Sequence, residues 1–189
     1  TLYGMKNLSS EQEEVLEVLK GLRHHLEYSS DEFGPHLLST AIYGLKCMKS
    51  DSQAVQDIVR ILGHRMRQLS EPLTPQEAST AIVGLRRMNP ADLCVEDLLF
   101  ALTKMIYATE DQMPAQNVHT VLHTIRRMDS NEQVVRGVIN ALRHRLDTEE
   151  ADANNVSKSL LILKSMDQSN DLVRSLYRKL VQSLVHDKK

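Results

Sequence analysis

The sequence predicts an all-α fold: an α-solenoid of stacked antiparallel helical hairpins, with about four and a half repeats of ~40 residues. Three observations support this prediction. The stretch STAIYGLKCM at 39–48 returns as STAIVGLRRM at 79–88. Apolar residues recur at helical spacing in five copies that stay in register. Aromatic residues make up only 4% of a chain that is 41% hydrophobic, which favours helices over strands.

The repeat is clearest at the residue that closes each copy, which we call the anchor. The anchors follow one another at intervals of 40, 40, 40 and 38 residues, and they are Leu8, Met48, Met88, Met128 and Met166. Further apolar residues stand seven, ten, fourteen and eighteen positions after each anchor. Because these steps are three or four residues long, they place the apolar side chains on one side of a helix.

Each repeat is expected to contain two helices, A and B. Helix A carries an apolar stripe that is expected to reach the anchor, and its start is marked in one copy by LTPQEAS at 73–79. There Thr74 is the expected N-cap, Pro75 the first helical residue and Glu77 the partner in a capping box. A short polar turn then leads to helix B. Gly44 and Gly84 lie beside the stripe and are expected to allow close helix packing.

We expect a single domain over 1–189, with a partial repeat at 1–28 and full repeats at 29–68, 69–108, 109–147 and 148–186. The first copy begins only seven residues before its anchor, so we expect the chain to be part of a longer array. No apolar run is long enough for a transmembrane segment, and none is expected.

The composition argues against most kinds of chemistry. The formal net charge is −2, so any nucleic-acid binding must depend on a local basic patch. The sequence shows no Gly-rich phosphate loop, no Ser–His–Asp arrangement and no repeated carboxylate pair, and its two cysteines cannot form a zinc site alone. His119 and His123 stand one turn apart without a third ligand in register. We therefore expect no enzymatic activity, cofactor, metal or small-molecule substrate.

The stretch LTPQEASTAIVGLRRM at 73–88 resembles helix A of octotricopeptide repeats, which are paired helices of similar length. Where that family carries Trp, this chain has Tyr43, Val83, His123 and Leu161. The resemblance implies sequence-selective binding of single-stranded RNA in a chloroplast or mitochondrion, supporting transcript maturation, stability or translation. Alternatively, it implies a protein–protein scaffold or accessory subunit of a large organellar complex, such as a ribosome or a photosynthetic or respiratory assembly.

A helical wheel places one candidate binding face on helix A, opposite the apolar stripe, with Arg87 and Arg127 near its centre. Parallel A helices would present one set of side chains per repeat, with amides, hydroxyls and rings for bases and cations for phosphates. The expected RNA- or partner-binding face comprises His36, Tyr43, Lys46, Gln76, Thr80, Arg86, Arg87, Gln116, His123, Arg126, Arg127 and Lys164. The basic residues have a second interpretation, because cations also complement the dipole at a helix C-terminus by about 0.3–1 kcal/mol each.

Overall fold

The computed structural model describes residues 2–29, 33–148 and 152–186, and within these ranges it is helical, with no β-strand. It contains a short 3₁₀-helix, η1, followed by nine α-helices in the described ranges. Their bounds are η1 Leu2–Met5, α1 Glu13–Tyr28, α2 Pro35–Tyr43, α3 Gln53–Arg67, α4 Pro75–Gly84, α5 Leu93–Ala108, α6 Ala115–Ile125, α7 Gln133–Arg145, α8 Ala153–Ser165 and α9 Asp171–His186.

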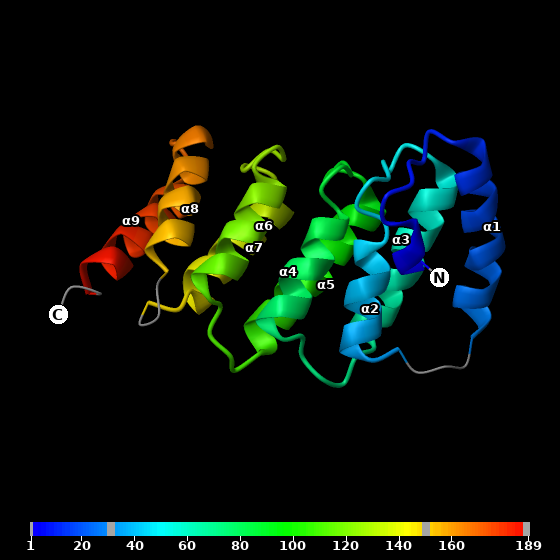
Figure 1. Cartoon of the computed structure of the whole chain (residues 1–189), viewed down its shortest axis with the longest axis horizontal. Helices are drawn as coiled ribbons and strands as arrows, with labels where there is room; N and C mark the ends of the chain where they lie inside the picture. Colours follow the sequence, from blue (N-terminus) through cyan, green and yellow to red (C-terminus); the bar gives the residue numbers. More distant parts are fainter. Residues whose placement is uncertain (1, 30–32, 149–151, 187–189) are drawn as a thin grey trace.

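The helices form two layers in an elongated row (Figure 1). Helices α2, α4, α6 and α8 contact one another in that order and form the layer nearer the viewer, which we call the A layer. Helices α1, α3, α5, α7 and α9 do the same behind them and form the B layer. η1 packs against α2 and extends the A layer at its N-terminal end. Each full repeat range predicted from the sequence holds one helix of each layer.

The core lies between the two layers and consists mainly of aliphatic and methionine side chains, most of them at the predicted stripe positions. Val18, ten positions after the first anchor, is 48% exposed, so the stripe prediction is wrong there. The anchors Met48, Met88, Met128 and Met166 are all buried. The first anchor, Leu8, is 41% exposed, so its predicted burial is wrong. In the first copy the four-residue η1 ends at Met5, and Leu8 lies outside any helix. No helix in the described ranges is both long and apolar enough to cross a bilayer.

The capping box predicted at the start of α4 is confirmed. The Thr74 hydroxyl accepts a hydrogen bond from the Glu77 backbone N–H, and the Glu77 carboxylate accepts one from the Thr74 backbone N–H at 3.0 Å. Pro75 is the first helical residue, where its missing N–H has no cost. These contacts fix where α4 begins and so fix the positions of the side chains that follow.

The A helices end earlier than the sequence predicts. Helices α2, α4 and α6 stop at Tyr43, Gly84 and Ile125, between three and five residues before their anchors. In α4 the chain continues as a tight turn, in which the Leu85 N–H donates to the Ile82 carbonyl and the Met88 N–H to the Leu85 carbonyl. These short-range bonds turn both side chains into the core. The basic residues between them therefore lie in turns and not on helices.

Glycine sets the spacing of the first A helices, as predicted. A Cβ atom added to Gly84 would lie 2.1 Å from the Ile42 carbonyl oxygen of α2. A Cβ atom on Gly44 would lie 2.2 Å from the Leu2 carbonyl oxygen of η1. Both distances are far below van der Waals contact, so only glycine permits this approach.

Polar contacts fix the register of the B layer. The nearly buried carboxylate of Asp57 in α3 accepts a hydrogen bond from Arg23 of α1 at 2.8 Å. Arg65 of α3 donates to the carbonyl oxygens of Leu26 and Ser29, at the C-terminal end of α1. Carbonyl oxygens at the end of a helix favour a cation, and here the next repeat supplies it.

The glycine contact gives a direct stability test. Gly84→Ala should lower the free energy of unfolding by about 1–3 kcal/mol, because α2 and α4 must separate to admit the methyl group. Gly21→Ala is the matched control, since nothing lies within 4 Å of its Cβ position in the exposed middle of α1. That change should stabilise the protein by about 0.5–1 kcal/mol. Urea unfolding of both variants measures the difference, and equal effects would contradict the packing described.

Candidate functional site

A groove of about 560 Å³ crosses the outer side of the A layer from η1 to α6. Four residues of the predicted binding face line it, namely His36, Tyr43, Gln76 and Thr80. The groove also contains residues that sequence reasoning missed, which are Tyr3, Ser39, Glu77 and Ser79. Of these, Tyr3 could have been found, because it stands forty residues before Tyr43 at the same repeat position. The structure thus gathers side chains from successive repeats into one surface feature.

A pair of tyrosines forms one end of the groove. The rings of Tyr3 and Tyr43 are stacked, with centroids 6.1 Å apart and planes inclined by 27°. Each hydroxyl accepts a hydrogen bond from a lysine three residues later, Lys6 at 2.8 Å and Lys46 at 3.1 Å. The hydrogen bond and charge of Lys6 lower the pKa of Tyr3. Aromatic faces bordered by ammonium groups suit a planar, negatively charged ligand.

Polar side chains of the groove form a hydrogen-bond network that includes a side chain of α6. The Asn117 amide, which is buried, donates to the Gln76 side-chain oxygen at 3.1 Å and to the Ser79 hydroxyl at 2.9 Å. Gln76 in turn donates to the Thr80 hydroxyl at 3.3 Å. The Gln76 side chain is therefore positioned by a neighbouring repeat while it remains exposed to a ligand.

Three exposed cations follow the groove-lining helices α4 and α6 in the chain, and we call them the arginine cluster: Arg86, Arg126 and Arg127. The pKa of His123 is lowered first by partial burial and then by the charges of Arg126, Arg86 and Arg127. Within the described residues, no carboxylate forms an ion pair with any of the three arginines. An uncompensated cluster of this kind attracts anions.

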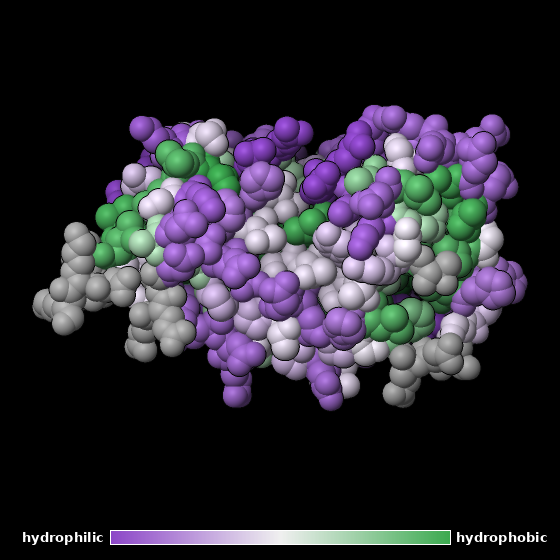
Figure 2. All heavy atoms as spheres, viewed as in Figure 1, coloured by the Kyte–Doolittle hydropathy of each residue, from purple (hydrophilic) through white to green (hydrophobic). Residues whose placement is uncertain are grey.

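The arginine cluster lies in the turns that follow α4 and α6. Arg86 lies in the turn between α4 and α5, and Arg126 and Arg127 lie at the start of the turn between α6 and α7. These turns stand at the upper end of the row in Figure 1. Strongly hydrophilic atoms line that edge in Figure 2, above a paler surface over α4. The arginine cluster therefore follows the two helices that contribute Val83 and Thr120 to the groove.

The prediction that Arg87 points to the centre of the A-helix face is wrong. Arg87 lies beyond the end of α4, and its guanidinium donates to the Cys47 carbonyl oxygen of the preceding repeat at 3.3 Å. Arg127 likewise lies in a turn at the edge. The helical wheel failed because the helix it assumes does not continue to these positions. The same finding bears on Lys46, which lies in the turn after α2.

Besides His123 and the basic residues of the turns, two further residues of the predicted face do not line the groove. Gln116 is exposed near the start of α6, and Lys164 is exposed in the last turn of α8. Leu161, three residues before Lys164 on α8, is apolar and 70% exposed. At α8 the predicted face therefore presents a cation and an apolar side chain, whereas the groove presents aromatic rings, amides and hydroxyls.

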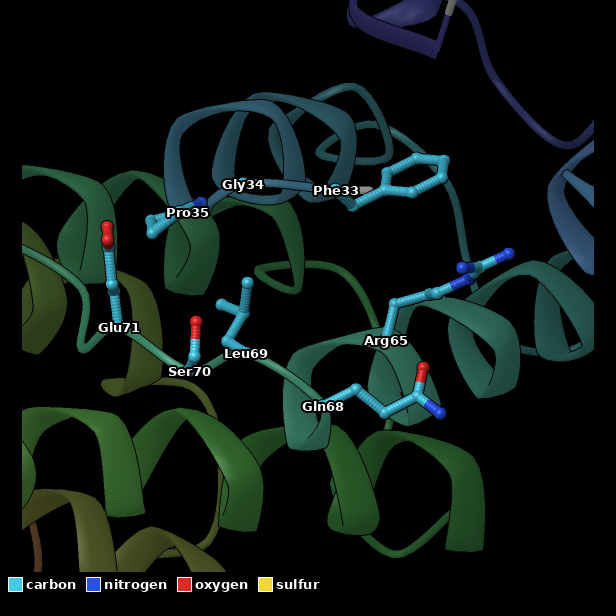
Figure 3. Close-up of a pocket in the computed structure, with 8 residues that line it drawn as sticks. All are labelled: Phe33, Gly34, Pro35, Arg65, Gln68, Leu69, Ser70 and Glu71. Atoms are coloured by element: carbon cyan, nitrogen blue, oxygen red, sulfur yellow. The ribbon is translucent and has the colours of Figure 1, made fainter. Parts of the chain in front are cut away.

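A second hollow, of about 550 Å³, lies between the start of α2 and the end of α3 (Figure 3). Its one cation is Arg65, whose guanidinium points towards the Phe33 ring with 5.1 Å to the ring centroid. Because Arg65 is already bonded to carbonyl oxygens at the end of α1, its role here is structural. Across the described ranges, no group of three or more His, Cys, Asp or Glu side chains is placed to hold a metal ion.

No protein-family model matches the chain, and neither a curated protein nor a solved structure matches it significantly. The resemblance to octotricopeptide repeats therefore stays a prediction from the sequence. Function has to be inferred from the groove and the arginine cluster themselves.

The electrostatic coupling within the cluster can be measured. Arg126→Gln should raise the pKa of His123 towards its ordinary value, because one of the cations that oppose imidazole protonation is removed. An NMR titration of the histidine ring protons would report the change. Lys20→Gln, which removes an exposed cation from α1, is the matched control and should leave the pKa of His123 where it is. A His123 pKa insensitive to Arg126 would show that the two side chains do not lie together.

Proposed function

We propose that this chain is a segment of an α-solenoid of stacked helical hairpins, similar to octotricopeptide repeats, and that it binds single-stranded RNA along the outer side of its A layer. It acts as a binding module without enzymatic activity. In line with the sequence resemblance, its task is transcript maturation, stability or translation in a chloroplast or mitochondrion. The observation that carries the proposal is the unpaired arginine cluster beside a groove of aromatic and polar side chains.

This combination matches the two needs of a single strand. Its phosphates require cations along one edge, while its exposed bases require flat rings to stack on and hydrogen-bonding groups to meet their edges. The arginine cluster supplies the first, and Tyr43, Gln76 and Thr80 supply the second. Since the whole chain carries a net charge of −2, attraction to RNA depends on this local patch and not on an overall field.

One observation favours the second candidate function, a protein scaffold or accessory subunit within a large organellar complex. Large apolar side chains are exposed on both layers, including Leu161 of α8 at 70%, Leu93 of α5 at 80% and Phe100 of α5 at 54%. Such side chains serve as contact points for another protein. The groove and the arginine cluster belong to neighbouring elements of the A layer, so we place RNA first.

Salt dependence tests the RNA proposal. Binding of a labelled, mixed-sequence single-stranded RNA should weaken steeply with salt, because each phosphate contact releases a counterion. Replacing Arg86, Arg126 and Arg127 together with Gln should weaken binding and flatten the slope of log affinity against log salt by about 2, from about 0.7 per lost contact.

The control removes equal charge from the B layer, through Lys20→Gln, Arg67→Gln and Lys104→Gln, three exposed residues of α1, α3 and α5. This variant should keep the wild-type slope. Equal losses in the two triple variants would show non-specific attraction. RNA binding that is absent in the wild type would reject the proposal and favour the protein scaffold.

A further inference from the structure

One position of the A layer forms a column along the row of repeats. It stands five residues before each anchor, and its occupants are Tyr3, Tyr43, Val83, His123 and Leu161. The first two are rings stacked on each other. The third is a small aliphatic side chain, half-buried on α4. Val83 therefore interrupts the rings of the column, which has a ring again at His123.

The groove lies where the next ring would be. Both Tyr43 and Val83 line it, together with Thr40 and Thr80 on the two helices that flank the position. One face of the Tyr43 ring is turned to Tyr3, and since η1, α2 and α4 follow one another in the layer, the other face is turned towards α4. A cavity bordered by an aromatic face on one side and a short aliphatic side chain below is suited to a flat ring.

We propose that a nucleobase of the bound RNA stacks on Tyr43 and lies over Val83, in the place that a third aromatic side chain of the column would fill. This inference rests on the proposed RNA-binding function and names its central base-binding subsite. Stacking of this kind is sequence-tolerant, because every base has a π-face.

Polar groups at the subsite are placed to meet the edge of the base. The Thr80 hydroxyl accepts a hydrogen bond from Gln76, which leaves its own proton free to donate. The Thr40 hydroxyl donates to carbonyl oxygens of its own helix and keeps its lone pairs as acceptors. The two hydroxyls thus offer one donor and one acceptor from adjacent repeats.

Cations follow both residues of the subsite in the chain and are available to the neighbouring phosphates. Lys46 and Arg86 occupy the same repeat position, two residues before their anchors, in the repeats of Tyr43 and Val83. The Lys46 ammonium lies 3.1 Å from the Tyr43 hydroxyl oxygen and 4.7 Å from the ring centroid. It therefore sits towards the hydroxyl end of the ring and leaves the rest of the face for a base.

Ring replacement tests the stacking. In the full 189-residue chain, Tyr43→Leu should weaken binding of a single-stranded RNA about 5- to 150-fold, the range for loss of one base–aromatic stack. Tyr43→Phe keeps the ring and should keep most of the affinity. Tyr28→Leu is the matched control, because Tyr28 is 71% exposed on α1 in the other layer, and it should have no effect. Thermal unfolding of each variant separates lost binding from lost fold.

Filling the subsite gives an independent test. Val83→Phe adds the missing ring of the column and should weaken RNA binding by excluding the base, whereas Val83→Ile adds one methyl group and should be close to neutral. RNA carrying 2-aminopurine provides a direct signal, since stacking on Tyr43 should quench its fluorescence in the wild type but not in Tyr43→Leu.

The outcomes separate the inference from the function on which it rests. If RNA binds with the expected salt dependence but Tyr43→Leu and Val83→Phe bind as tightly as the wild type with equal quenching, the base subsite is overturned and RNA binding stands. If the wild type binds no RNA, both are overturned. The subsite is supported if Tyr43→Phe keeps the RNA affinity of the wild type while Tyr43→Leu and Val83→Phe lose it.

Discussion

The close approach of consecutive A helices is the constraint on which the candidate binding surface depends. Gly84 brings the backbone of α4 against the Ile42 carbonyl of α2, and Gly44 brings α2 against the Leu2 carbonyl of η1. This spacing places Tyr3 and Tyr43 within stacking distance and sets Val83 beside them. Because a side chain at either glycine would push the helices apart, the packing residues decide where the ligand-facing residues stand.

The glycine contact is confined to one half of the molecule. At the equivalent positions of α6 and α8 stand Thr124 and Ile162, whose side chains exclude so close a backbone approach. The groove spans the half that has the glycines, while the arginine cluster marks where the two halves meet. The same repeat unit thus produces both the groove and the arginine cluster. The residue at the glycine position decides how closely neighbouring A helices approach, and so which side chains of neighbouring repeats come together.

Sequence periodicity predicted the parts of the fold that are local or strictly repeated. The anchors from Met48 onward, the capping box of Thr74 and the close packing at Gly84 were all predicted from the sequence. Four of the groove residues were also in the predicted face. The repeat period, the capping signals and the helical wheel depend only on spacing along the chain. They therefore predict correctly those features that local or repeated spacing determines.

The errors arose where contacts cross between repeats or a helix ends. Arg87 was misplaced because α4 ends at Gly84 in a tight turn, which a helical wheel cannot anticipate. Its bond to the Cys47 carbonyl spans forty residues of sequence. The influence of both Arg86 and Arg126 on His123 likewise results from the stacking of repeats, and nothing in either segment alone predicts it.

The central claim is that ligand contact is confined to the A layer and its turns. Hydrogen–deuterium exchange with and without saturating single-stranded RNA tests it most directly. The account predicts slower exchange in α2 and α4 and in turns 44–52, 85–92 and 126–132, with α3, α5 and α7 unchanged. Slower exchange in the B helices alone, or no change anywhere, would contradict it.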